Sequence, residues 1–432
     1  MTTGKKFTSN SGHRFMQKLS KSLIALASIA ILGSSPTFAE PVPSKEDTAA
    51  PVKAISSFAL KMHQGLSQKE KGNLFYSPMS VHTIMTVAQN GAAGSTLEQL
   101  VRALDLSVAT DNNQSAYQML LARINSPLVL KDGTKAYTLN IANALWRQTG
   151  FSFNEEFLSD SEKKFCSEIE PLEFAKPDLA ADTINNWVEE KTNHKIKKLI
   201  SSEDIALTTR LILTNAIYFK GSWEKKFKKS ATIKQPFKIA DGLQSDAWMM
   251  HQTERFKYFE NDSIQLLSLP YQGGELSMNI ILPKDSSSIN QLEQSLTSSQ
   301  LSDWQIQAQA ERVEVSFPKF KFSQRFNLND LFLGLGATDA FSPGLANFSR
   351  MTAEQQLYIA KIIHATFIDV NEEETEAAAA TAVVMRANGA LMAPQVTKTF
   401  CADHPFLFTI SHNPTGAILF MGRIMDPTAT DN

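Results

Sequence analysis

The sequence predicts an α+β fold built as one continuous domain over residues 52–427. In the first half, apolar residues recur at helical spacing, and in the second half short apolar or alternating runs indicate strands. Neither a second linker nor an internal repeat interrupts the chain after residue 51. A chain of 432 residues commonly holds two or three domains, so this unbroken pattern outweighs the expectation from length.

The N-terminus predicts a secretion signal over residues 1–39. Five basic residues and no acidic one precede Glu40, residues 23–32 (LIALASIAIL) are apolar, and Thr37-Phe38-Ala39 supplies small residues for cleavage. The apolar run is too short to span a membrane, which takes about 20 residues. Residues 40–51 are polar and contain proline, which indicates a linker. We therefore expect a secreted protein, extracellular or periplasmic.

The charge of the chain without residues 1–39 argues against nucleic acid as a partner. Subtracting the five leader residues leaves 37 basic against 44 acidic residues, a net charge of −7. No apolar run is long enough for a membrane span, so a membrane is not expected as a partner either. Two short lysine clusters are expected to be solvated surface: Lys225, Lys226, Lys228 and Lys229, and separately Lys195, Lys197 and Lys198.

The two cysteines, Cys166 and Cys401, are too few for a disulfide framework. Although they could pair in an oxidising compartment, we expect free and mostly buried thiols.

Two segments predict helices in the first half. One apolar stripe at helical spacing follows the linker, and a second lies in residues 181–200. The stripes consist of Ile55, Phe58, Ala59, Met62 and Leu66, and of Ile184, Trp187, Val188 and Ile196.

Strand signals dominate the second half. Val313, Val315 and Phe317 alternate with polar residues, and Phe320 and Phe322 continue the pattern, so a strand with a break at Pro318 is predicted. Further strands are predicted at 276–282, 357–370, 406–410 and 417–421.

Residues 371–399 show no core-like pattern, although strand signals resume after them. Irregular segments of this length inside a domain are uncommon and usually functional. An acidic run, Glu372–Glu376, leads into four alanines, which could form a turn of helix. Read as a strand, however, Thr375, Ala377, Ala379 and Thr381 share one small face that can be buried. Glu376 lies on the other face, toward water, so the segment is a candidate for insertion into a sheet.

At these residues the sequence resembles the serpins. The stretch EEETEAAAATAVVM at 372–385 is similar to the hinge of inhibitory members, and the resemblance covers about residues 52–427. Other stretches agree in the family's order: 73–80 (NLFYSPMS), 214–223 (TNAIYFKGSW), 269–271 (LPY), 317–319 (FPK), 403–406 (DHPF) and 420–427 (FMGRIMDP).

The resemblance implies a fold of three β-sheets and eight or nine helices. It also implies an exposed reactive loop, at about residues 371–399, and leaves 428–432 as a C-terminal tail. A serine or cysteine protease would cut the loop as a substrate. The freed loop would then insert into the large sheet and trap the acyl-enzyme. The partner expected is that protease, the native state must be metastable, and a monomer is expected.

The resemblance also implies roles for individual residues. Trp223 matches the aromatic residue where the loop first inserts, and Lys319 and Glu372 match an ion pair there. The polar cluster where the sheet must part comprises Ser77, Ser80, Asn215 and His364. The hinge comprises Glu372, Glu374, Thr375, Glu376, Ala377, Ala378, Ala379, Ala380 and Thr381. Glu374 stands where the family usually has glycine. Glutamate restricts the backbone more than glycine does, which should slow insertion.

The position of the cut bond stays open. Counting fourteen residues from Thr375 in the family's spacing gives Asn388–Gly389. Arg386–Ala387 is the alternative that suits trypsin-like proteases. Leu391 is a third candidate, because this loop is longer than many.

An enzyme is not expected, because the eight histidines are scattered and neither HExxH nor GxSxG occurs. The Gly334-Leu335-Gly336 stretch lacks the third glycine of a dinucleotide loop. No cofactor and no metal are expected. The remaining alternative is a non-inhibitory serpin that acts as a chaperone, carrier or storage protein. Such proteins usually lose the small hinge residues that Ala377–Thr381 keep here.

Overall fold

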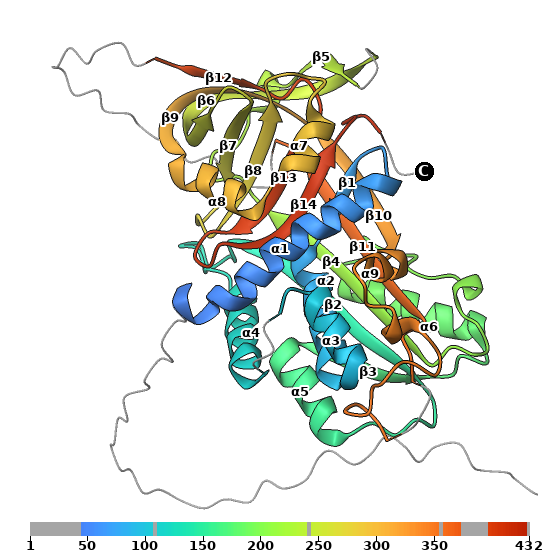
Figure 1. Ribbon diagram of the computed structural model, residues 1–432. Coiled ribbons are helices and arrows are strands. Elements are labelled where there is room, and N and C mark those ends of the chain that lie inside the picture. The colour runs from blue at the N-terminus through green and yellow to red at the C-terminus, as the bar shows by residue number, and fades with distance from the viewer. Residues whose placement is uncertain (1–44, 107–109, 240–242, 354–356, 373–395, 430–432) are drawn as a thin grey trace, which may run out of the picture. The chain divides into compact units, whose positions relative to one another are not determined.

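The structure is a computed structural model, which describes residues 45–106, 110–239, 243–353, 357–372 and 396–429 (Figure 1). The secretion signal, the cut bond and the hinge beyond Glu372 lie outside these residues. The described α-helices are α1 (Lys45–Lys69), α2 (Pro78–Gly91), α3 (Gly94–Ala103), α4 (Thr110–Ile124), α5 (Glu155–Phe165), α6 (Pro177–Lys191), α7 (Ile289–Ser295), α8 (Ser298–Gln307) and α9 (Asn329–Gly334).

Five strands form one sheet, in the spatial order β10-β11-β4-β2-β3. Their bounds are β10 (Phe320–Asn327), β11 (Lys361–Val370), β4 (Leu211–Gly221), β2 (Tyr137–Gln148) and β3 (Ser167–Leu172). Alternate side chains point to opposite faces. One face therefore presents Leu213 and Ile362 to the main core, while the other presents Ala216 and Ala365 to α6. We call these the inner and the outer face.

Nine strands form the second sheet, in the order β1-β14-β13-β8-β7-β6-β9-β12, with β5 paired to β6. Their bounds are β1 (Leu74–Tyr76), β14 (Ala417–Ile424), β13 (Phe406–His412), β8 (Leu276–Pro283), β7 (Ile264–Pro270), β6 (Gln244–Glu260), β9 (Gln309–Pro318), β12 (Lys398–Cys401) and β5 (Ile233–Lys238). The long strand β6 joins two groups of strands. Its residues 244–258 pair with β5 and β9, whereas only its last residues, 257–260, pair with β7. The two smaller sheets implied by the resemblance are thus hydrogen-bonded into one network.

Aromatic side chains fill the space between the two sheets. Phe75 stacks on Phe420 with ring centroids 5.0 Å apart and on Phe408 at 5.9 Å. All three side chains are fully buried. The break predicted at Pro318 is confirmed, since β9 ends there and β10 begins two residues later, in the other sheet.

Three sequence expectations need correction. Helix α1 begins at Lys45, inside the predicted linker, because Glu46 and Asp47 favour a helix start, and Pro51 lies inside this helix. Helix α6 ends at Lys191 rather than near 200, because Asn193 and His194 adopt positive φ angles. Cys166 is free but exposed, at the left-handed end of α5, while Cys401 is free and half-buried.

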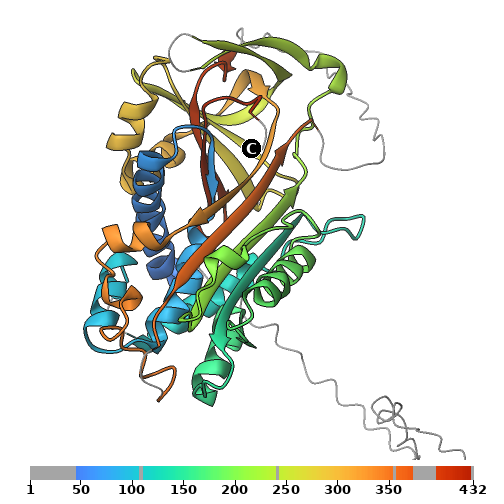
Figure 2. The same cartoon turned by 90° about the vertical axis from the view of Figure 1, so that its right-hand side faces the viewer.

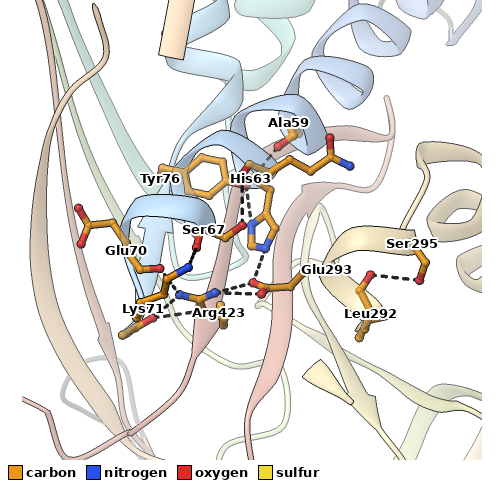
Figure 3. A network of polar contacts seen from close by, with 12 residues as sticks. Ala59, His63, Ser67, Glu70, Lys71, Tyr76, Leu292, Glu293, Ser295 and Arg423 are labelled. Atoms are coloured by element: carbon orange, nitrogen blue, oxygen red, sulfur yellow. Dashed lines mark hydrogen bonds and ion pairs between the residues drawn. The ribbon is translucent and has the colours of Figure 1, made fainter. Parts of the chain in front are cut away.

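A buried ionic network lies between α1, α7 and β14, and sequence reasoning missed it (Figure 3). Arg423 donates two hydrogen bonds to Glu293, at 2.8 and 2.9 Å, and its other nitrogens reach backbone carbonyls at Glu70 and Gly72. The ring of His63 lies between Glu293, at 2.7 Å, and the Tyr76 hydroxyl, at 3.0 Å. Burial raises the pKa of Glu293, but its bonds to His63 and Arg423 outweigh burial and leave that pKa below the usual range.

Candidate functional site

The centre of the five-stranded sheet is a parallel pair that separates at one end. β4 and β11 pair in parallel from Ile212–Lys361 to Tyr218–Phe367, whereas each is antiparallel to its other neighbour (Figure 2). Beyond that point, residues 219–221 and 368–370 are not paired with each other. A strand inserted here in the opposite direction would be antiparallel to both, which is the slightly more stable arrangement.

A polar cluster lies beneath the paired part of these strands. The Ser77 backbone N–H donates to Nε2 of His364 over 3.0 Å, and its hydroxyl donates to the Leu419 carbonyl over 2.6 Å. The Asn215 amide donates to the Ser80 hydroxyl. These four predicted residues, Ser77, Ser80, Asn215 and His364, are therefore brought together, and each is fully buried.

Asn143 completes the cluster, and the sequence prediction missed it. It lies opposite Asn215 in the β2–β4 pairing, and its side-chain oxygen accepts hydrogen bonds from Asn215 and from the Ser80 hydroxyl. A polar residue in a strand otherwise rich in apolar residues was the available signal. Because buried polar groups in native proteins are hydrogen-bonded, an asparagine there needs partners across the sheet.

Burial lowers the pKa of His364 to about 3, although a hydrogen bond with the Asn215 backbone acts in the opposite direction. The neutral ring accepts from Ser77 through Nε2, so a proton at Nε2 would face another donor. A histidine with a lowered pKa contributes stability that is complete above pH 6.5 and is lost as pH falls toward 3. Acid should therefore weaken the contact between β11 and α2.

We predict that His364→Asn removes one pH-dependent contribution to stability. As pH falls from 6.5 to 4.5, the free energy of unfolding measured in urea should decrease less steeply in the variant than in the unchanged protein. The two slopes should differ by about 1.4 kcal/mol per pH unit. The matched control is His194→Asn, because the His194 side chain is 75% exposed. Equal slopes for the unchanged protein and His364→Asn would contradict the prediction.

Trp223 lies at the end where β4 and β11 separate. Its ring stacks on Tyr271, with centroids 4.6 Å apart, and its indole N–H donates to the Asn371 carbonyl over 2.9 Å. Tyr271 directly follows β7, so this stack connects the loop after β4 with the second sheet. Asn371 is the first residue after β11, so this hydrogen bond from Trp223 holds the chain in place where it leaves the sheet.

Lys319 and Glu372 form the predicted ion pair, with an N–O distance of 2.7 Å. The Glu372 side chain is 7% exposed and the Lys319 side chain 36% exposed. Burial raises the pKa of Glu372, but the hydrogen bonds from Lys319, Thr232 and the backbone, together with the charge of Lys319, outweigh burial and lower that pKa. The pair therefore holds a charged carboxylate at the first residue of the predicted hinge.

An opening of about 710 Å³ lies over the unpaired ends of the two strands. It is lined on the outer face by Tyr218 and Lys220 of β4, Phe367 and Asp369 of β11, and Lys321 of β10, and at its rim by Lys195, Lys229, Lys319 and Glu372. We call this space the sheet opening. The predicted lysine clusters that contribute Lys195 and Lys229 are exposed, as expected.

These features match a known family. A family model described as serpin (serine protease inhibitor) matches residues 53–427. The chain belongs to the serpin family. An uncharacterized serpin-like protein of Thermococcus kodakarensis is 39% identical over 385 residues, which cover 89% of this serpin and 87% of that protein. Leukocyte elastase inhibitor of Homo sapiens is 38% identical, over 87% of this serpin and 98% of that protein.

The structural comparison agrees with the sequence comparison. The crystal structure of uncleaved ovalbumin has a TM-score of 0.79 at 29% identity and covers 88% of this serpin and 100% of that chain. The predicted α+β serpin fold is therefore confirmed, as is the expectation that the protein is not an enzyme, since the serpin family is non-enzymatic.

Two other kinds of site are not found in the described part of the chain. Among its residues, no helix is both long and apolar enough to cross a membrane. Within the same ranges, no group of three or more His, Cys, Asp or Glu side chains could hold a metal ion.

Proposed function

We propose that this serpin is a suicide-substrate inhibitor of serine endopeptidases, with cysteine endopeptidases as a second target class. The protease attacks the reactive loop, and the cut loop inserts between β4 and β11 before the acyl-enzyme is hydrolysed. The observation that carries the proposal is the parallel β4–β11 pair, which separates close to the end of β11, and in the sequence the small-residue stretch follows soon after that end. Fourteen inserted residues, Thr375 to Asn388, would add a strand of roughly 45 Å at about 3.3 Å per residue.

The contacts of the polar cluster support this mechanism. Insertion requires the β4–β11 backbone bonds to break while the surrounding residues keep their hydrogen bonds. Asn215 on β4 and His364 on β11 are each bonded to α2 or its N-cap, through Ser80 and Ser77. The two strands therefore have separate anchors beneath the sheet, and these two hydrogen bonds can persist when the strands part.

We also propose that the protein acts after export, outside the cell or in the periplasm. The support is the basic leader, its ten-residue apolar run and the small residues at 37–39.

The direct test is incubation of the purified protein with trypsin, chymotrypsin and elastase at equimolar amounts. A trapped protease should give a covalent complex that survives SDS, and the mass of the released C-terminal fragment should identify the cut bond. A fragment that begins at Gly389 would select Asn388–Gly389 over Arg386–Ala387. If proteases cut the loop and all leave fully active, the inhibitory function is wrong and a carrier, chaperone or storage role is favoured.

A second prediction concerns cleavage itself. Protein cut in the loop should unfold about 10 °C or more above intact protein, because an inserted strand gains roughly a dozen backbone hydrogen bonds at about 1 kcal/mol each. Differential scanning calorimetry of both forms measures this shift. Identical melting curves would mean that the cut loop stays outside the sheet.

A further inference from the structure

Positive side chains are in excess around the sheet opening. Five lysines line it, and two carboxylates, Asp369 and Glu372, line it as well. Both carboxylates are already paired, Asp369 with Lys321 at 3.0 Å and Glu372 with Lys319 at 2.7 Å. Two further lysines of the lining, Lys195 and Lys220, lie beyond these two pairs. This excess favours an anionic occupant.

Lys220 is the lysine best placed to meet that occupant. It lies in the stretch of β4, residues 219–221, that β11 does not pair with, and it is half-buried. Within the described residues it has no ion-pair partner. Its neighbour Phe219 packs against the main core, so Lys220 belongs to the outer face of the sheet.

On the opposite side of the opening, the unpaired part of β11 also places one residue on the outer face of the sheet. Within residues 368–370 of β11, Ile368 and Val370 belong to the core, which leaves Asp369 on the outer face. A strand inserted between β4 and β11 would therefore have Lys220 on one side and Asp369 on the other. A carboxylate on that strand would be attracted by Lys220 and repelled by Asp369, unless the charge of Asp369 is cancelled.

The chain itself supplies such carboxylates. Glu373, Glu374 and Glu376 follow Glu372 closely, beginning three residues beyond the end of β11. If Thr375, Ala377 and Ala379 face the core on insertion, the period of two places Glu374 and Glu376 on the outer face. Directly opposed residues of neighbouring strands have Cβ atoms about 5 Å apart, within reach of a Lys–Glu pair.

We propose that the sheet opening is a binding site for the acidic hinge, in which Lys220 pairs with Glu374 or Glu376 as the loop inserts. Lys321 is a positioning residue, because its ion pair with Asp369 removes the repulsion from the other side of the opening. This inference rests on the proposed function and deepens it. It also explains how this serpin tolerates Glu374 at a position where glycine is usual.

The first test reverses charges in the full protein, using whichever of the three proteases is trapped. Lys220→Glu should slow complex formation about fivefold at low salt and raise the number of inhibitor molecules consumed per protease. Glu376→Lys alone should have a similar effect, and the two changes together should restore the rate to within about twofold. At 1 M NaCl the differences should shrink, because the screening length falls to about 3 Å.

The matched control is Lys53→Glu, which makes the same charge change at an exposed position on α1. If Lys220→Glu and Lys53→Glu trap the protease equally fast, the inference is wrong while the proposed function stands.

The second test needs no protease. A synthetic peptide of residues 375–388 (TEAAAATAVVMRAN) and its variant with Gln in place of Glu376 are incubated with the intact protein, and incorporation is followed on native gels. At low salt the peptide with Glu should incorporate about fivefold faster into the unchanged protein, and both should incorporate equally into Lys220→Glu. Equal rates in the unchanged protein, or no incorporation of either peptide, would overturn the inference.

Discussion

Ala379→Arg should convert this serpin from an inhibitor into a substrate. In the proposed insertion Ala379 belongs to the face that becomes buried, and an unpaired buried charge costs about 3 kcal/mol or more. Such a cost slows insertion roughly a hundredfold relative to hydrolysis of the acyl-enzyme. The loop should still be cut, but the protease should be released active, and titration of protease activity against inhibitor measures the change.

The matched variant is Ala378→Arg, one residue away on the opposite face. Because that face leads to the sheet opening and to water, Ala378→Arg should keep most of the inhibition. If both arginine variants inhibit as well as the unchanged protein, the loop does not insert as a strand with Ala379 on the buried face.

Arg423→Met should destabilise the folded protein strongly. Arg423 and Glu293 are 2% and 6% exposed, so removing the guanidinium leaves a buried carboxylate whose remaining hydrogen-bond partner among the described residues is His63 (Figure 3). Breaking a buried ion pair from one side costs about 3–5 kcal/mol. Unfolding in urea, followed by circular dichroism at pH 7.5, measures the loss.

Two further variants separate charge from packing. Adding Glu293→Gln to Arg423→Met removes the stranded charge and should recover part of the loss. Lys69→Met breaks an exposed pair with Asp330, whose side chains are 60% and 69% exposed, and should change stability by less than about 0.5 kcal/mol. A loss in Lys69→Met as large as in Arg423→Met would contradict the role given to burial.

The fold could be predicted where local pattern decides it. The stripe from Ile55 to Leu66 and the alternation around Phe317 predicted α1 and β9 because side-chain period and secondary structure are directly linked. The pattern could not show where α6 stops, since that depends on positive φ at Asn193 and His194. Nor could it show that β6 joins two groups of strands, because its partner β9 is distant from it in sequence.

The site was predicted unevenly for a similar reason. Resemblance supplied Ser77, Trp223 and His364, and the structure brings them to the sheet positions described above. Asn143 and Glu293 were missed because each is defined by partners distant in sequence. Glu293, for example, lies 130 residues from Arg423 and 230 from His63. A lone polar residue in an apolar strand shows that a partner is needed, but it does not show which residue that partner is.

The pairing of β1 with β14 bears on when the protein can fold. Leu74 near the start pairs with Arg423 near the end, and β14 is also the partner of β13. Until the residues of β14 have left the ribosome, β1 and β13 each expose an unpaired edge and the main core stays incomplete. The nascent chain therefore cannot complete its fold before β14 has left the ribosome, and such distant contacts then form slowly. A leader that directs export would thus act on a chain still able to thread through a translocation channel.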